Sequence, residues 1–146
     1  MERLILYERS RQALKKFYQK MNEKSREIKL SDKTHWHVAH GMHHDYNYST
    51  ALDVASLSFQ AMKHTEFCQV VNTKRYDCVT KLRTYKWVNT NNLLWDPSHQ
   101  FKGIKTGITQ TAGPCLAVNF VSKEQNFDFI VVILNCKSRE ASFLEV

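Results

Sequence analysis

The chain has 146 residues, of which 42% are hydrophobic, with only four Gly and two Pro, a composition that excludes a disordered chain and fits one folded domain at most. The formal net charge of +7 raises the alternative of an anionic partner such as nucleic acid. Because the cations are spread along the chain and no basic run exceeds two residues, an ordinary basic surface is favoured and we expect no nucleic-acid partner.

No segment predicts secretion or membrane insertion. The apolar run Leu4–Tyr7 is too short for a signal peptide, and the longest purely apolar run, Phe129–Leu134, is too short to cross a bilayer. The four Cys, at positions 68, 78, 115 and 136, form no Cys-x-x-Cys pair, which favours core thiols over a disulfide framework.

The first predicted element is an amphipathic helix from Leu6 to Ile28. Its apolar residues recur at intervals of three and four, and charged residues fill the other face. This pattern favours a surface helix with a solvated charged side over a membrane-binding helix.

A long loop over residues 30–50 follows, and it holds five of the seven His: His35, His37, His40, His43 and His44. Imidazole is a common Zn²⁺ ligand, so a metal site is one alternative. No Cys or Glu joins the cluster at ligand spacing, and we therefore predict no metal and no cofactor.

The next helix is predicted from Ala51 to about His64. Ser49 or Thr50 can cap it, and Thr50 with Asp53 forms a variant of the capping box, a structural role that outweighs a catalytic one for the Asp. Apolar residues form a stripe along it that we expect in the core: Leu52, Ala55, Leu57, Phe59 and Met62.

The segment from residue 66 to residue 100 contains shorter elements. A short helix or turn is expected over 66–71, one or two strands over 75–88, and a turn over Asn89–Asn92. Trp95–His99 is predicted to be a loop, in which Trp95 covers the following sheet or, as a less favoured alternative, stacks on a sugar.

Three strands, 101–109, 113–121 and 127–135, predict an antiparallel meander, with a hairpin connection over 122–126. Ser138 then caps a short C-terminal helix that begins at Arg139. Together these elements predict an α/β (α+β) chain in which helices pack on an antiparallel sheet.

The first of these strands carries the triplet Lys105-Thr106-Gly107. A Lys ammonium can hold a substrate carboxylate, a Thr hydroxyl can donate to the same group, and Gly leaves room for a ligand against the strand edge. Lys-Thr-Gly on a strand is one signature of the serine β-lactamases and penicillin-binding proteins, although three residues alone also fit a turn at a strand end.

The flanking residues resemble the D-alanyl-D-alanine carboxypeptidase family, the low-molecular-mass penicillin-binding proteins of the S11 serine peptidase type. The matching blocks occur in the family's order: Phe17, Met21-Asn22 and Lys24; Thr34-His35-Trp36 and His40-Gly41-Met42; Tyr48-Ser49-Thr50-Ala51 and Asp53; Asn89-Thr90-Asn91 with Leu93-Leu94; Gly103–Thr109; and Ala112–Leu116. Val38-Ala39 depart from the family's usual Asn-Pro. The resemblance implies a partial β-lactamase/transpeptidase-like fold. A serine β-lactamase shares the triplet, but the Tyr-Ser-Thr-Ala and Asn-Thr-Asn blocks favour the carboxypeptidase.

The family's nucleophile motif is missing from the chain. No Ser lies three residues before a Lys, and no Ser has Asn two positions later, so neither Ser-x-x-Lys nor Ser-x-Asn is present. A Ser hydroxyl needs an adjacent base to act as a nucleophile. We therefore expect no catalytic residue in this chain, no activity of the chain alone, and a single partial domain over residues 1–146 that is cut at both ends.

The resemblance also implies the ligand and the residues that bind it. In the family, which is extracytoplasmic, the reaction removes the terminal D-alanine of a peptidoglycan stem peptide through an acyl-enzyme. By matched position, Lys105 and Thr106 would hold the terminal carboxylate, Gly107 would leave room, and Ile108 or Thr109 would offer strand-edge backbone to a D-Ala-D-Ala peptide or a β-lactam. The alternative is a non-catalytic relative that binds a peptide or another partner without turnover. The resemblance further implies that the first helix lacks packing partners, so part of its apolar face is bare.

Overall fold

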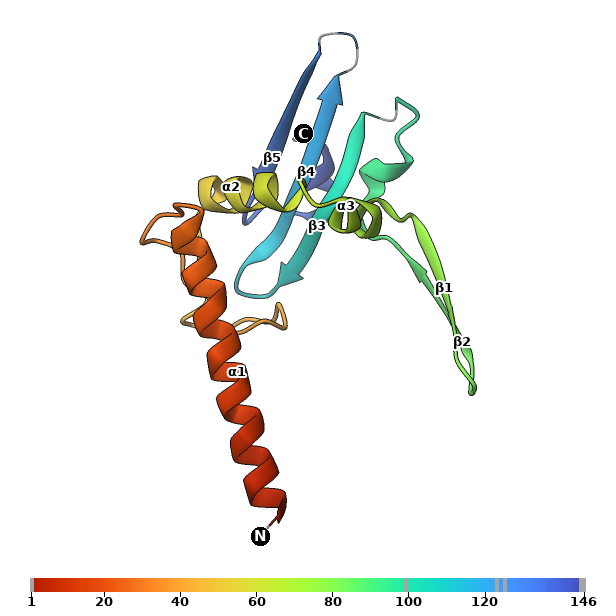
Figure 1. Ribbon diagram of the computed structural model, residues 1–146. Helices are drawn as coiled ribbons and strands as arrows, with labels where there is room; N and C mark the ends of the chain where they lie inside the picture. Colours follow the sequence, from red (N-terminus) through yellow and green to blue (C-terminus); the bar gives the residue numbers. More distant parts are fainter. Residues whose placement is uncertain (1, 99, 123, 125, 145–146) are drawn as a thin grey trace. The chain divides into compact units, whose positions relative to one another are not determined.

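The computed structural model describes residues 2–98, 100–122, 124 and 126–144. They form two compact units, Met1–Leu57 and Ser58–Val146, each with its own internal packing (Figure 1). Helices and antiparallel sheets make up the chain, as the sequence predicts.

The first unit is built on α1, a helix from Glu2 to Glu27 that confirms the predicted one. Just beyond its end, Lys29 takes a left-handed conformation with φ 59°. The Lys29 N–H donates to the Arg26 carbonyl at 3.0 Å, and the Leu30 N–H donates to the Ser25 carbonyl at 2.9 Å. This pair of bonds satisfies carbonyls that the helix end would leave open, and it turns the chain into the loop of residues 30–50.

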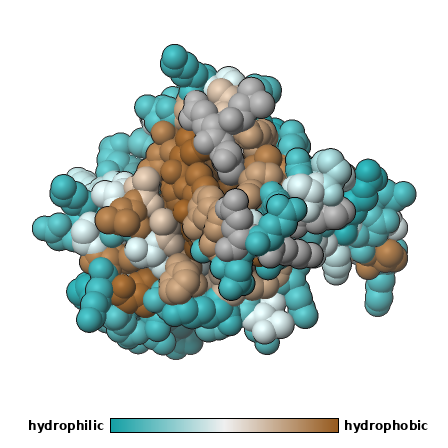
Figure 2. All heavy atoms as spheres, turned by 90° about the horizontal axis from the view of Figure 1, so that it is seen from above, coloured by the Kyte–Doolittle hydropathy of each residue, from teal (hydrophilic) through white to brown (hydrophobic). Residues whose placement is uncertain are grey.

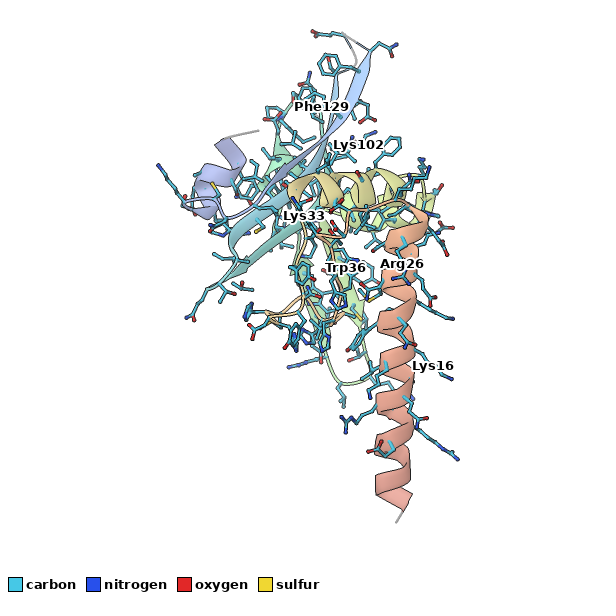
Figure 3. All side chains as sticks on the ribbon, turned by 90° about the vertical axis from the view of Figure 1, so that its left-hand side faces the viewer. Lys16, Arg26, Lys33, Trp36, Lys102 and Phe129 are labelled. Atoms are coloured by element: carbon cyan, nitrogen blue, oxygen red, sulfur yellow. The ribbon has the colours of Figure 1, made fainter. Side chains whose placement is uncertain are left out.

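Polar contacts around Trp36 hold this loop on α1 (Figure 3). The Asn22 side chain accepts a hydrogen bond from the Trp36 N–H at 2.9 Å and donates to the Trp36 carbonyl at 2.7 Å. The Trp36 indole N–H donates to the Ser25 hydroxyl at 2.6 Å. Farther along, His35 and Tyr48 exchange two backbone hydrogen bonds, of 2.9 and 3.1 Å, which close the loop on itself.

Part of the apolar face of α1 is bare, as the family resemblance implies. Leu14 is 50% and Phe17 is 52% exposed. Phe17 also lines a hollow of about 400 Å³ together with Met21, Trp36 and Leu57. Within the described residues, no helix combines the length and the hydrophobicity that a membrane span requires.

Asp53 ties α2, the helix Ala51–Ala61, to the loop. Its carboxylate is buried, and it accepts hydrogen bonds from the Ser31 hydroxyl at 2.5 Å, the Ser31 N–H at 2.9 Å and the Thr34 hydroxyl at 2.6 Å. These bonds, the one from the Ser31 hydroxyl foremost, lower the pKa of Asp53 from 3.8 to about 2, although burial acts in the opposite direction. The Thr50 hydroxyl accepts a bond from the Asp53 N–H at 3.1 Å, which confirms Thr50 as the helix cap.

Replacing Asp53 with Asn is expected to lower the free energy of unfolding at pH 7 by about 1–2 kcal/mol. Because the folded pKa lies below the unfolded value, the carboxylate stabilises the fold above about pH 4, and this contribution is lost as the pH falls from about 4 towards about 2. Urea unfolding at a series of pH values, followed by circular dichroism, measures the free energy of unfolding. Across this pH window the free energy of unfolding should fall less in Asp53→Asn than in the wild type. The exposed Asp32, on the same loop, provides the control Asp32→Asn. Equal stability of Asp53→Asn and the wild type at pH 7 would contradict this role.

Two residues of the apolar stripe predicted along α2 are exposed rather than buried, whereas Ala55, Leu57 and Met62 are half-buried. Asp53 and Ser58 are each 5% exposed, whereas Leu52 is 76% and Phe59 is 57% exposed. The prediction of a core position is therefore wrong for Leu52 and Phe59. The inward side of the helix carries the Asp53 carboxylate, whose partners are the polar groups of the loop.

The second unit starts at Ser58, within α2, and continues with the helix α3, Thr65–Asn72. An antiparallel hairpin of β1, Arg75–Val79, and β2, Thr84–Val88, follows. A short 3₁₀ helix, η1, then spans Asn92–Trp95. Of the alternatives left open by the sequence, a short helix or turn and one or two strands, the structure has the helix and two strands.

The sheet of the second unit has the order β3-β4-β5, with β3 at Phe101–Thr109, β4 at Gly113–Ser122 and β5 at Phe127–Ile133. All pairs are antiparallel, so the predicted meander is confirmed. The central strand β4 carries the core residues Leu116, Ala117 and Val118, which are 2%, 5% and 0% exposed. Leu94 of η1 is also buried.

The helix α4, Arg139–Leu144, follows the sheet. The Ala141 N–H donates to the Ser138 hydroxyl at 3.0 Å, which confirms Ser138 as its cap. This cap fixes the start of the helix whose first residue is Arg139.

Four Phe side chains cluster where β4 leads into β5. Phe101, Phe120, Phe127 and Phe129 have ring centroids 5.1–6.1 Å apart. Phe127 and Phe129 remain 39% and 46% exposed. Seen from this end, hydrophobic side chains form a patch bordered by hydrophilic ones (Figure 2).

Candidate functional site

The triplet lies on β3, an edge strand of the described sheet. Lys105 pairs with Ala117, Thr106 with Leu116 and Gly107 with Cys115 across to β4. All three triplet residues line one pocket of about 230 Å³, together with Thr90, Ile108, Pro114, Cys115, Arg139, Ser142 and Phe143. The structure therefore brings Lys105, Thr106 and Gly107 together at one hollow.

A chain of hydrogen bonds joins the pocket's polar groups. The hydroxyls of Thr90 and Thr106 lie 2.5 Å apart, and the Arg139 guanidinium donates to the Thr90 carbonyl at 2.8 Å. The Lys105 amine donates to the Thr106 carbonyl. Two exposed cations and a pair of hydroxyls, supplied by β3, α4 and the segment before η1, thus surround one small space that suits an anion.

Arg139 is a site residue that the sequence analysis missed. Its position after Ser138 indicated only the start of a helix. Arg139 reaches the pocket because α4, the helix that follows β5, packs against β4 beside the triplet. No local pattern around Arg139 signals this role, since the proximity depends on how the whole meander folds.

The Asn89-Thr90-Asn91 block positions Thr90. The Asn89 amide donates to the carbonyls of Val71 and Thr73, at 3.2 and 3.1 Å, and the Asn89 side-chain oxygen accepts from the Asn91 N–H at 3.0 Å. The Asn91 side-chain oxygen accepts from the Leu93 N–H at 3.1 Å and so caps η1. The two Asn therefore fix the backbone on either side of Thr90, whose hydroxyl faces Thr106.

The close packing of α3 on β3 fixes the strand that carries the triplet. The Gly103 N–H donates to the Asn72 side-chain oxygen at 2.9 Å. A Cβ added at Gly103 would lie 2.3 Å from the Val71 carbonyl oxygen. The register between β3 and β4 shifts just after Gly103, between that residue and Lys105. Such a bulge re-aims the side chains that follow it.

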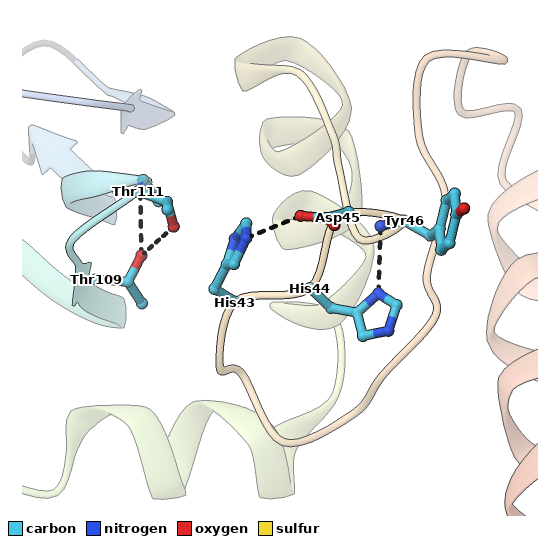
Figure 4. Close-up of polar contacts among 7 residues, drawn as sticks. His43, His44, Asp45, Tyr46, Thr109 and Thr111 are labelled. Atoms are coloured by element: carbon cyan, nitrogen blue, oxygen red, sulfur yellow. Dashed lines mark hydrogen bonds and ion pairs between the residues drawn. The ribbon is translucent and has the colours of Figure 1, made fainter.

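Thr109 lies at the end of β3, outside the residues that line the pocket. Its hydroxyl accepts a hydrogen bond from the Ala112 N–H at 3.0 Å and lies 3.3 Å from the Thr111 hydroxyl (Figure 4). Thr109 therefore shapes the turn between β3 and β4, where Gly113 takes a positive φ of 64°.

The His side chains of the first unit engage one another and nearby aromatic or polar groups. The His37 and His44 rings stack with centroids 4.2 Å apart, and His35 Nδ1 lies 2.7 Å from the Tyr46 carbonyl. His43 pairs with Asp45 at 3.1 Å (Figure 4). Over the described part of the chain, no three His, Cys, Asp or Glu side chains gather closely enough to hold a metal ion.

The family model for D-alanyl-D-alanine carboxypeptidases, Peptidase S11, matches residues 9–138. The chain belongs to this family. The resemblance drawn from the sequence blocks is thereby confirmed.

Curated members of the S11 family share about a third of their aligned residues with this chain. The D-alanyl-D-alanine carboxypeptidase of Streptomyces sp. strain K15 is 35% identical over 109 residues, which are 70% of this chain and 37% of that protein. The carboxypeptidase DacD of Salmonella typhimurium is 32% identical over 126 residues, which are 84% of this chain and 30% of that protein. The matches thus span only 30–37% of the length of these two relatives.

Solved structures of the same group share the fold. The Streptomyces K15 DD-transpeptidase superposes with a TM-score of 0.79 at 33% identity, over 90% of this chain and 51% of that one. Penicillin binding protein 5 of Haemophilus influenzae gives a TM-score of 0.77 at 26% identity, over 88% of this chain and 36% of that one. The predicted partial transpeptidase-like fold is confirmed.

Proposed function

We propose that this S11-family chain forms the wall of a peptide site that holds the terminal carboxylate of a D-alanyl-D-alanine peptide. Lys105 and Thr106 bind the carboxylate, and Arg139 adds a second cation. The observation that carries the proposal is the convergence of Lys105, Thr106, Thr90 and Arg139 on one pocket. A carboxylate accepts charge-assisted hydrogen bonds from just such groups.

The strand edge beside the pocket leaves room for the peptide. A Cβ added at Gly107 would meet no atom within 4 Å, and Ile108 is 65% exposed. An extended peptide can therefore lie along β3 and pair with its backbone at Ile108 and Thr109, while its terminal carboxylate enters the pocket. Because β-lactams also carry a carboxylate, the same groups would bind the carboxylate of a β-lactam.

We further infer that the chain alone does not hydrolyse the peptide. The support is chemical: acyl transfer by this family needs a Ser activated by a nearby base, and no Ser in the sequence precedes a Lys by three residues. The chain thus supplies binding groups, and turnover requires a nucleophile that its sequence does not contain.

A fluorescent penicillin is expected to leave the purified chain without a covalent label. The measurement is denaturing gel electrophoresis after incubation, with an active S11 carboxypeptidase as the positive control. Stoichiometric labelling of this chain would refute the inferred inactivity.

Reversible binding distinguishes a peptide-binding chain from an inert one. Fluorescence polarisation of a labelled peptide ending in D-Ala-D-Ala should rise with the concentration of the chain and fall again when unlabelled peptide is added. The peptide should be recovered intact, since binding without turnover is the expected behaviour. A flat titration up to millimolar concentration would contradict the proposed site.

A further inference from the structure

The hairpin of β1 and β2 projects from the second unit (Figure 1). Its tip carries exposed apolar side chains. The turn is closed by Thr80, whose N–H and hydroxyl donate to the Arg83 carbonyl at 3.0 and 2.7 Å. The turn presents Leu82, which is 96% exposed, and Val79, at the end of β1, is 78% exposed. Two aliphatic side chains are thus held in solvent by a well-formed turn.

One face of the hairpin carries a row of three aromatic side chains. Tyr76 pairs with Trp87 across the strands, and their rings lie 6.0 Å apart at an interplanar angle of 6°. Tyr85 follows on the same face, 5.9 Å from Trp87. Tyr76 and Trp87 are 58% and 54% exposed, and both line a hollow of about 490 Å³ that extends to Val70 of α3.

Cations are frequent in the same segment as these apolar and aromatic groups. Residues 74–88 contain five of them, with Asp77 as the sole acidic residue: Lys74, Arg75, Lys81, Arg83 and Lys86. Lys81 and Arg83 flank Leu82 in the turn, and the Arg83 guanidinium lies 4.2 Å above the Tyr85 ring. The hairpin therefore combines an aliphatic tip, aromatic rings and a concentrated positive charge.

We propose that this hairpin docks on an anionic lipid surface. Leu82 and Val79 enter the outer part of the bilayer, Trp87 and Tyr76 lie at the level of the headgroups, and the cations contact lipid phosphates. Aromatic rings favour the membrane–water interface, and each Lys or Arg near an anionic surface strengthens attachment. The positive hairpin and the negative surface are complementary in charge.

The aliphatic tip favours lipid over nucleic acid as the partner. Single strands bind by stacking bases on open aromatic faces, but a face of Tyr85 is covered by Arg83 and the most exposed groups are Leu82 and Val79. Contact with a nucleic acid contributes little binding free energy from aliphatic side chains, whereas their transfer from water into hydrocarbon is favourable. None of these hairpin residues lines the Lys105 pocket, so the docking is independent of peptide binding.

Vesicle co-sedimentation of the full chain tests the proposal. We expect binding to vesicles that contain about one third phosphatidylglycerol, little binding to phosphatidylcholine alone, and weakening as salt is raised. The double variant Lys81→Glu/Arg83→Glu should lower the partition coefficient by at least about 30-fold. Leu82→Asp should lower it several-fold.

Matched variants elsewhere separate docking from general charge and hydrophobicity. Lys15→Glu/Lys16→Glu on α1 makes the same change in net charge, and Leu52→Asp changes a leucine that is 76% exposed. Both should change vesicle binding by less than about threefold, with circular dichroism confirming that every variant is folded. As a second readout, binding of the wild type to anionic vesicles should shift its tryptophan emission to shorter wavelength. The variant Trp87→Phe should lose most of this shift.

Four results would overturn the proposal. They are no binding to anionic vesicles, equal binding to neutral ones, equal losses for the hairpin and α1 charge variants, and retention of a single-stranded oligonucleotide at concentrations that leave anionic vesicles unbound.

Discussion

Replacing Lys105 with Met is expected to weaken the binding of a peptide ending in D-Ala-D-Ala by about tenfold to a hundredfold. Met keeps most of the length and the apolar stem of the side chain, so the change removes the charge and little else. A hydrogen bond to a charged group contributes about 1.5–3 kcal/mol, and each 1.4 kcal/mol corresponds to tenfold in affinity. Two-dimensional NMR titration measures the constants, since a shallow site predicts weak affinity, on the order of millimolar.

Lys102 supplies the matched control for this variant. It lies on the same strand, is exposed, and is absent from the residues that line the pocket (Figure 3). Lys102→Met removes the same charge and should change the affinity less than about threefold. Equal losses for the two variants would mean that only the net charge of the chain matters, which would contradict a specific carboxylate site.

Replacing Gly103 with Ala is expected to cost about 3 kcal/mol in the free energy of unfolding of the second unit, and to lower its Tm by more than about 10 °C. The new Cβ would lie 2.3 Å from the Val71 carbonyl oxygen and 3.2 Å from the carbonyl carbon. Both are backbone atoms of α3, so the helix would have to move away from β3. That movement would also break the 2.9 Å hydrogen bond from the Gly103 N–H to Asn72.

Gly107→Ala provides the control for this steric argument. Its Cβ would enter open space on the same strand, so the stability should change by less than about 0.5 kcal/mol. The same variant should weaken peptide binding, because the added methyl group occupies the space proposed for the ligand. Thermal unfolding by circular dichroism measures both variants, and a Gly103→Ala protein as stable as the wild type would contradict the packing described here.

Much of the fold follows from local patterns. Apolar segments separated by short polar connections predict β3, β4 and β5, and three- and four-residue spacing predicts α1, because both patterns are local properties of one element. Leu52 and Phe59 of α2 show the limit of this argument. Spacing identifies an apolar stripe, but it does not reveal that Asp53, bonded to Ser31 and Thr34, occupies the inner side of the helix.

The candidate site is also only partly readable from the sequence. Lys105, Thr106 and Gly107 are consecutive, so their motif predicts that they act together. Thr90 and Arg139 join them through tertiary structure, and only the Thr90 contact lies in a block that the family resemblance singles out. Thr109 belongs to the same motif region, yet its hydroxyl bonds within the turn, since Thr109 ends the strand just beyond the residues that line the pocket.

The most direct test of the proposed carboxylate site is a map of backbone amide shifts on adding a D-Ala-D-Ala peptide, compared with the same peptide whose C-terminal carboxylate is amidated. We predict that the acid shifts the amides of Thr90, Thr106, Gly107, Ile108 and Arg139, and that the amide form shifts them at least tenfold less at equal concentration. Equal shifts with both peptides, or shifts confined to residues outside this pocket, would contradict the account.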